Sequence, residues 1–353
     1  MYLAPSKFDP RMSKFKFYFI ALTASLTLFS CHKNDDGVTI APPRDRAEQY
    51  AADIDSIETY LKTHYMTVTT IDGLQDITID TLIAGDGHVS IWDNTEYPLH
   101  KDKIVKDDAR LSNLTTGGSE DPVSYKMYYL ILNQGGGATR PTTVDSTFTS
   151  YRGWKLDNEE FDRNKNGIWS TYPVLTTAES GLISGYRQFL TELNPAESVT
   201  NNGDGTYTFN NAGVGVVFLP SGLGYFNTAR ANIPAYSPLI FTIRLNSVKR
   251  RDHDLDGVLS VYEDLNNNGD YFDDDTDGDT APDFIDADDD GDRYYTKEEI
   301  RKPAGEAGPS WKYPFDPIPN ADPLLSEPAG IPNCAGDTSS PTRLRKHLDP
   351  SCH

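Results

Sequence analysis

The chain is poor in cysteine, in basic side chains and in apolar residues. Its 353 residues include three cysteines, too few for a disulfide scaffold. Only 32 Lys and Arg accompany 53 Asp and Glu, and a net charge of −21 argues against nucleic acid or an anionic lipid surface as an electrostatic partner. Hydrophobic residues make up 37%, below the usual globular share, so part of the chain is not expected to build a core.

The negative charge is concentrated in one stretch. Residues 252–299, named the acidic segment below, contain sixteen Asp and three Glu against one Arg and one Lys, a charge of −17. The remaining residues carry only −4. A nearly neutral protein therefore contains one strongly acidic segment, and the two parts need separate explanations.

A short apolar run near the start predicts an export signal. It extends from Phe17 to Phe29, is too short to span a bilayer comfortably, and is followed at once by polar sequence. We therefore interpret residues 1–30 as a signal peptide, with Met1 or Met12 as the translation start.

The apolar run ends in Leu-Phe-Ser-Cys, which resembles a bacterial lipobox. The resemblance implies that Cys31 is lipidated and becomes the mature N-terminus, with enough acyl chains for stable anchoring. Residues 31–44 would then be a tether. We expect an exported protein anchored by lipid at the outer membrane, facing the periplasm or the surface; an ordinary secretory signal is the alternative.

Residues 45–248 predict one α+β domain. Apolar residues at helical spacing predict a helix over 46–64, and β-branched alternation from Met66 onward predicts strands. One further short helix is expected over 184–193. The pattern is typical of a mostly antiparallel sheet with few helices.

Three motifs occur in this domain in a fixed order. The first is Tyr151-Arg152-Gly153 followed by Phe161-Asp162, and the second is Gly-Leu-Ile-Ser-Gly-Tyr at 181–186. The third combines an Ile-Pro pair at 233–234 with Leu-Pro-Ser-Gly-Leu-Gly-Tyr at 219–225 and Leu-Ile-Phe-Thr-Ile-Arg-Leu at 239–245. Together they resemble the motifs of FKBP-type peptidyl-prolyl cis-trans isomerases, and their joint order over about a hundred residues is more specific than any one motif.

The resemblance implies an antiparallel sheet wrapped around one short helix, with an apolar pocket between them. The backbone N–H of Ile183 and the hydroxyl of Tyr225 would each donate a hydrogen bond to a substrate carbonyl. Trp169 or Tyr172 would supply a further aromatic ring. The pocket would be lined by Tyr151, Phe161, Asp162, Leu182, Ile183, Tyr186, Tyr225, Ile233 and Phe241. Taken singly, each of these aromatics fits plain core packing better than a binding site, and only their joint spacing favours the pocket.

The implied activity needs no cofactor. Amide resonance sets a barrier of roughly 18–20 kcal/mol for rotation about a peptide bond. Because a planar amide is more polar than a twisted one, an apolar pocket disfavours the ground state relative to the twisted transition state. Two positions depart from the family pattern: Tyr186 stands where Trp is usual, and Phe226 where Gly is usual. Residues 198–213 form an insertion with a hairpin turn at 202–205.

The acidic segment contains oxygen-rich loops of the kind that calcium prefers. Asp252-x-Asp254-x-Asp256-Gly257 ends with Glu263 at position twelve, a full match to the EF-hand loop pattern. Three similar stretches follow with overlapping periods. The expected ligands are Asp252, Asp254, Asp256, Val258, Glu263, Asp264, Asn266, Asn268, Asp273, Asp275, Asp277, Asp286, Asp288, Asp290, Asp292 and Glu299, with Glu298 as an alternative to the last.

The overlapping loops resemble thrombospondin type 3-like repeats more than paired helix-loop-helix hands. The resemblance implies several structural calcium ions. Without ions, a charge of −17 should unfold the segment by self-repulsion. The alternatives are a disordered acidic linker and a dockerin-like module that binds a cohesin partner.

Residues 300–353 hold ten of the 23 prolines and little periodicity, which predicts an extended or loosely packed tail. Cys334 and Cys352 could pair in an oxidising exported compartment, or remain free thiols.

Our leading hypothesis is a membrane-anchored prolyl isomerase that assists the folding of exported, proline-containing polypeptides, followed by an irregular calcium-loop repeat and a Pro-rich tail. The alternatives are a non-catalytic, calcium-dependent binding protein with a degenerate pocket, and a spacer for surface display.

Overall fold

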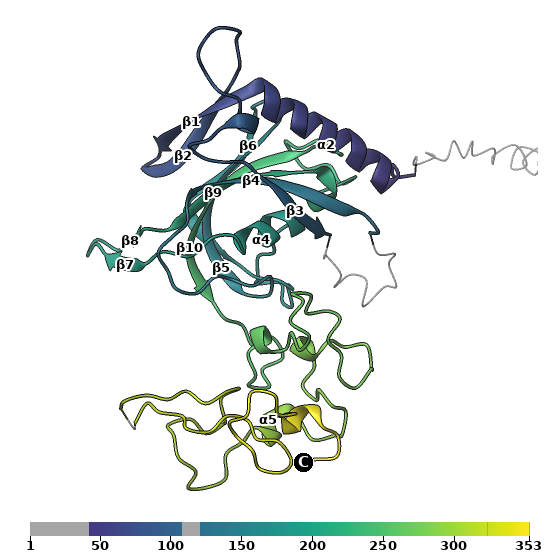
Figure 1. The fold of residues 1–353 in the computed structure, drawn as a ribbon, viewed down its shortest axis with the longest axis vertical. Coiled ribbons are helices and arrows are strands. Elements are labelled where there is room, and N and C mark those ends of the chain that lie inside the picture. Colours follow the sequence, from purple (N-terminus) through teal and green to yellow (C-terminus); the bar gives the residue numbers. More distant parts are fainter. Residues whose placement is uncertain (1–41, 108–120, 323, 353) are drawn as a thin grey trace, which may run out of the picture. The chain divides into compact units, whose positions relative to one another are not determined.

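The computed structural model describes residues 42–107, 121–322 and 324–352, shown in Figure 1. The predicted signal peptide, Cys31 and most of the tether lie outside the described residues. Everything below concerns the unit of residues 44–353. In the described ranges, no helix is both long enough and apolar enough to cross a bilayer.

Helix α2 (Arg46–Thr63) confirms the first predicted helix to within one residue. The Asp45 side chain caps its N-terminus by accepting a hydrogen bond from the Glu48 backbone N–H. Ile57 and Leu61, four residues apart, are fully buried on one face of α2. This face packs against the main sheet.

The main sheet has six antiparallel strands in the order β3-β4-β9-β10-β5-β6. The strands are β3 (His100–Lys106), β4 (Ser124–Asn133), β5 (Ser146–Lys155), β6 (Glu160–Ser170), β9 (Gly213–Leu219) and β10 (Leu239–Lys249). Two hairpins stand beside it, β1 (His64–Ile71) with β2 (Leu74–Thr81) and β7 (Ser198–Asn201) with β8 (Tyr207–Asn210). The second hairpin confirms the turn predicted within the insertion.

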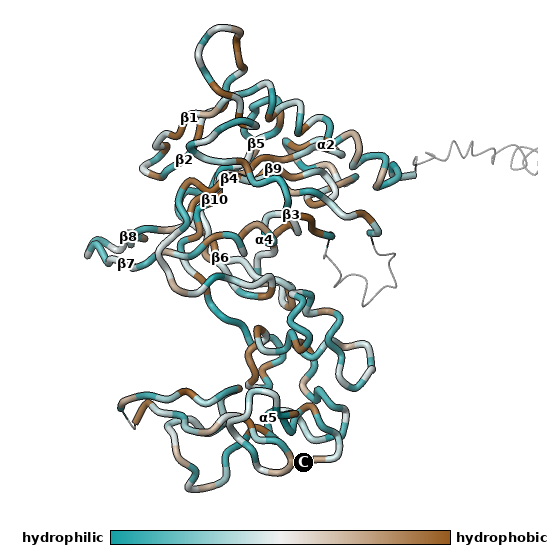
Figure 2. Tube along the Cα trace, viewed as in Figure 1, coloured by the Kyte–Doolittle hydropathy of each residue, from teal (hydrophilic) through white to brown (hydrophobic). Residues whose placement is uncertain are grey.

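The sheet separates two apolar clusters because side chains alternate along a strand. On β10, Phe241 and Ile243 belong to the cluster that contains the short helix, whereas Ile240 belongs to the cluster beneath α2. Strands β9 and β10 are apolar over much of their length, as Figure 2 shows. They bury side chains on both faces of the sheet.

Helix α4 (Ser184–Leu190) lies against the face of the sheet opposite α2 and is three residues shorter than predicted. Its Phe189 ring occupies the space above Gly215 of β9, where a Cβ atom would come within 2.6 Å of the ring. A glycine is therefore required at this position for the helix to approach the sheet. The mixed, mainly antiparallel architecture is consistent with the FKBP-like fold that the motifs implied.

The strand at each edge of the sheet is rich in charged residues. On β6, Arg163 forms ion pairs with Glu160 and with Asp72. At the opposite edge, β3 has the sequence His-Lys-Asp-Lys-Ile-Val-Lys.

The prediction of a loosely packed tail is wrong. Tyr313 and Ile331 of the tail form a small core with Val258 and Ile300. The buried Arg343 donates to the Ile331 and Phe315 carbonyls. Single side chains in irregular loops make these contacts, so no periodic signal marks them in the sequence.

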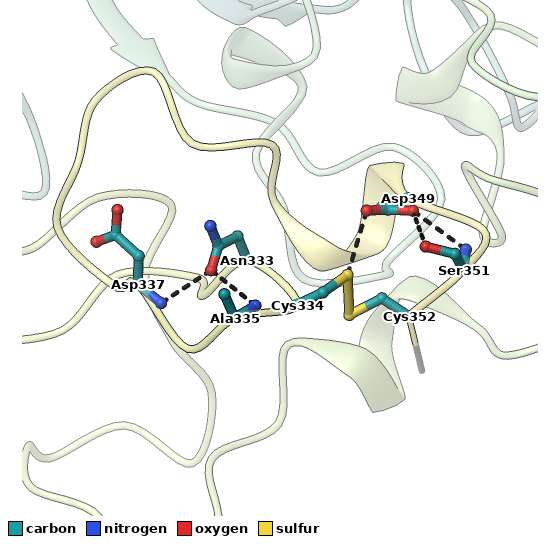
Figure 3. Close-up of a disulfide and its surroundings, with 7 residues drawn as sticks. All are labelled: Asn333, Cys334, Ala335, Asp337, Asp349, Ser351 and Cys352. Carbon is teal, nitrogen blue, oxygen red and sulfur yellow. Dashed lines mark hydrogen bonds between the residues drawn. A yellow bond between two sulfur atoms is a disulfide. The ribbon is translucent and has the colours of Figure 1, made fainter.

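The structure joins Cys334 and Cys352 by a disulfide with a Cα–Cα distance of 5.5 Å (Figure 3). Asp349 lies beside the bond and accepts hydrogen bonds from the Ser351 backbone N–H and hydroxyl. The bond ties the end of the chain to the loop at 333–337.

A buried carboxylate fastens α2 to the loop after β9. Asp53 is 2% exposed, and its Oδ2 accepts hydrogen bonds from the Ser221 backbone N–H (2.8 Å) and hydroxyl (2.6 Å). Its Oδ1 accepts from Gln49 of the same helix at 2.7 Å.

We expect Asp53→Ala to lower the free energy of unfolding by about 2–3 kcal/mol, because it removes charge-assisted hydrogen bonds and leaves the buried Ser221 N–H without an acceptor. Urea denaturation measures the change. Asp55→Ala, on the exposed face of the same helix, is the matched control and should cost no more than about 0.5 kcal/mol. Equal losses in the two variants would contradict this role.

Candidate functional site

A cavity of about 720 Å³ opens between the sheet and the N-terminus of α4. Strands β5, β6 and β10 and the loop after β9 contribute to its wall. The sequence predicted eight of its 17 lining residues. Eight predicted residues converge there: Tyr151, Phe161, Asp162, Leu182, Ile183, Tyr186, Tyr225 and Phe241.

Phe241 is the centre of the aromatic wall. Its ring meets those of Tyr186 and Phe161 edge to face, with centroid distances of 5.3 and 5.4 Å, and that of Tyr151 at 6.2 Å. Gly153 makes this packing possible, because a Cβ atom there would lie 2.5 Å from the Phe161 ring. The Y-x-G motif thus supplies both a ring and the space beside it.

Polar groups sit at the edges of the aromatic wall. The Tyr151 hydroxyl donates to Asp162 at 2.6 Å, and burial together with this hydrogen bond raises the pKa of Tyr151. The fully buried Tyr186 hydroxyl donates to Thr149 at 3.0 Å. The Arg230 guanidinium carbon lies over the Tyr225 ring, 4.9 Å from the ring centroid. Burial raises the pKa of Tyr225. The pocket therefore combines an aromatic wall with polar groups, some of them buried.

Three predicted aromatic or apolar residues lie elsewhere. Trp169 is 46% exposed and lines, with Lys249 and Arg251, an adjoining depression that shares Ile168 and Ser170 with the pocket. Its neighbour Ile168 faces the pocket, since side chains alternate along β6. Tyr172 lies outside the lining and stacks under Arg187, and Ile233 is buried in the adjoining core.

The pocket also has lining residues that no motif indicated. Arg230 and Thr228 come from the loop after β9, and Ser180 precedes α4. They lie in connections of irregular length, where sequence spacing gives no signal.

The acidic segment gathers carboxylates into three clusters, in each of which the ligand oxygens lie within 4.8 Å of one another. None of the clusters involves a regular strand. Their members are Asp254, Asp256, Glu263 and Asp289; Asp275, Asp277 and Asp279; and Asp288, Asp290 and Asp292.

The chemistry of these groups fits a hard divalent cation. Glu263 of the first cluster is 2% exposed, and Glu299, which lies outside all three clusters, is 3% exposed. In the described part of the chain, neither oxygen of either carboxylate has a hydrogen-bond partner. Burying a charged carboxylate without compensation costs several kcal/mol. Donor sets of oxygen alone suit calcium better than a transition metal.

The predicted ligand set and the observed clusters differ in part. Asp279 and Asp289 belong to clusters although no motif assigned them, whereas the predicted ligands Asp252, Asp286 and Glu299 lie outside all three. Val258 was expected to offer its backbone carbonyl, and this expectation stays a prediction. Glu299 and Glu298 were the two candidates for the last calcium ligand of the acidic segment. Glu299 is buried, whereas Glu298 forms an ion pair with Arg301 at 3.0 Å.

The second predicted loop is held by hydrogen bonds among its own side chains. Asn266 donates to Asp273 at 3.1 Å, and Asn268 donates to the same carboxylate at 2.8 Å. Asp264 accepts from the Asn268 and Gly269 backbone N–H groups. These residues form no carboxylate cluster within the described ranges.

Comparisons with known proteins connect the two parts of the chain to different relatives. Residues 253–326 match the family described as BamM C-terminal. No curated protein matches the chain. The family match covers the acidic segment and part of the tail, not the pocket.

Similar solved structures include a peptidyl-prolyl cis-trans isomerase from Pseudomonas syringae pv. tomato str. DC3000, with 19% identity and a TM-score of 0.27, covering 35% of this chain and 76% of that one. FkpA from Escherichia coli has 14% identity and a TM-score of 0.30, covering 69% and 75%. The N-terminal domain of FKBP42 from Arabidopsis thaliana has 15% identity and a TM-score of 0.27, covering 37% and 94%. Likeness at this level transfers no function.

We expect the stability of the cation-free acidic segment to fall as the pH rises. Burial, with the charge of Asp256 adding to it, raises the pKa of Asp254 to about 9, and burial raises the pKa of Asp256 to about 7. Because folding raises these pKa values above about 4, the folded state binds more protons, so the contribution is present near pH 4 and is lost as the pH passes through about 7–9.

Near-ultraviolet circular dichroism melts in chelator, at about pH 5 and about pH 8.5, test the sign. With calcium present the trend should reverse, because the ligands must be deprotonated to bind. A melting temperature in chelator that increases with pH would contradict the expected direction.

Proposed function

We propose that this protein is a peptidyl-prolyl cis-trans isomerase that acts on proline-containing segments of exported polypeptides. The observation that carries the proposal is the convergence of three separate motifs on one aromatic pocket. Plain core packing would not require Tyr151, Leu182 and Tyr225 to border the same open cavity.

The pocket acts through its polarity and shape. A proline ring would lie against Phe241 and Tyr186, which exclude water from the amide. The apolar surroundings disfavour the planar, more polar amide relative to the twisted one. Ile183 is the N-cap residue of α4 and lines the pocket, which supports a role for its backbone N–H as a donor to a substrate carbonyl. The Tyr225 hydroxyl, also in the lining, would donate to a second carbonyl. No covalent intermediate is needed.

We expect the protein to accelerate isomerisation of an X–Pro peptide in a protease-coupled assay, and Phe161→Ala to reduce kcat/KM by about tenfold or more, which is roughly 1.4 kcal/mol of transition-state stabilisation. Trp169→Ala is the matched control, because it removes an aromatic ring from the same strand outside the pocket. Its kcat/KM should stay within about twofold of wild type, and thermal melts would show that both variants are folded.

If the wild-type chain gives no rate above the spontaneous one, the catalytic proposal fails. The remaining candidate would then be a calcium-dependent binding protein with a degenerate pocket.

We further propose that the protein is lipidated at Cys31 and works at the outer membrane. The Leu-Phe-Ser-Cys sequence supports lipidation. The similarity of residues 253–326 to the BamM C-terminal family is loosely consistent with an outer-membrane location.

The acidic segment, we propose, binds structural calcium ions. The buried carboxylates outnumber the basic side chains near them. Lys312 lies near Asp256, and Lys346 lies near Glu299. Calcium would supply the missing positive charge and order the loops.

We expect chelator to lower the melting temperature and to change the circular dichroism spectrum. A ligand present at about a hundredfold above its Kd stabilises the folded state by about 2.7 kcal/mol per site. Re-addition of calcium should restore both signals, whereas magnesium, which demands a smaller octahedral site, should restore them less effectively. Identical melts with and without chelator would contradict a structural role for calcium.

A further inference from the structure

Neighbouring side chains of the last acidic loop belong to different carboxylate clusters. Asp288 and Asp290 place their oxygens in one cluster. Asp289, between them, instead joins Asp254 and Glu263 of the first loop. A single short stretch thus reaches two clusters, one local and one built with residues more than twenty positions earlier in the chain.

Asp289 is the most deeply buried member of its cluster. It is 1% exposed, and neither of its carboxylate oxygens has a hydrogen-bond partner among the described residues. The backbone N–H of Asp289 donates to the Thr296 hydroxyl at 3.3 Å, which fixes the main chain. Glu263 faces it with the same two properties, a buried side chain and two carboxylate oxygens without partners.

The four carboxylates of this cluster need a cation to be stable side by side. Lys312 is the basic group that faces them, and its Nζ donates to the Gly257 carbonyl. One ammonium does not balance four carboxylates, and like charges in a buried site repel strongly. Calcium prefers carboxylate and backbone oxygens as ligands, and this cluster supplies four carboxylates.

We propose that Asp254, Asp256, Glu263 and Asp289 bind one calcium ion that joins the first and last loops of the acidic segment. The inference rests on the proposed calcium binding and adds to it a ligand that no loop motif assigns, Asp289. The ion closes the chain between positions 263 and 289, and the intervening loops are held within that closure.

Calcium titration of the full chain by isothermal calorimetry tests the assignment. Asp289→Asn and Glu263→Gln should each weaken the same binding event by about tenfold or more, because each neutralises a buried ligand. The double variant should weaken this same event further and leave the other binding events within about twofold, because both side chains are ligands of one ion.

Two further variants serve as controls. Glu298→Gln removes one charge from an exposed position in the same segment and should leave every binding event within about twofold. Asp277→Asn, in a separate cluster, should weaken a different event and combine independently with Asp289→Asn. If Asp289→Asn does not fold at saturating calcium, Asp289→Ser, which also removes the charge but keeps a small oxygen-bearing side chain, takes its place.

Two results separate the inference from the proposal on which it rests. If the wild-type chain binds no calcium, the calcium proposal itself fails. If the wild-type chain binds calcium while Asp289→Asn titrates like Glu298→Gln, or Asp289→Asn and Glu263→Gln weaken two different binding events, the shared site is overturned and calcium binding by the segment stands.

Discussion

The alternation of side chains along the central strands is the constraint on which the pocket depends. Strands β4, β9 and β10 bury residues on both faces, so each must keep its register for two apolar clusters at once. A slip of one residue in β10 would turn Phe241 away from the pocket and bring Ile240 into its place. Helix α2 and helix α4 hold the sheet from opposite sides, and the Asp53 carboxylate fixes α2 to the loop that also carries Tyr225.

The acidic segment obeys a different physical rule. It buries a few apolar side chains, Val258, Tyr271 and Phe284 among them, and its folded form brings carboxylates together rather than apart. The Pro-rich tail adds apolar side chains such as Tyr313 and Ile331, which pack with Val258, and the cation Lys312. The segment and the tail therefore form one structural unit, although their compositions are very different.

Sequence reasoning located the pocket because motif residues lie on regular strands and at a helix start, where spacing translates directly into direction. It misplaced Trp169 by one position on β6, which is enough to turn a side chain to the other face. Asp289 was missed because the loop motif assigns ligands only to alternate positions, and Asp289 stands at an unassigned position between Asp288 and Asp290. The packing of the tail was missed because single side chains in irregular loops, such as Arg343 and Tyr313, make its contacts. Such residues produce no periodic pattern in the sequence.

The charged outer strands have a consequence for any extended polypeptide that approaches the protein. An open sheet edge presents unpaired N–H and C=O groups on which a foreign strand can assemble. Here the lysines of β3 and the Glu160–Arg163 pair of β6 would have to shed water before such pairing could begin. A protein whose proposed clients arrive unfolded is thereby protected from becoming a template for their aggregation.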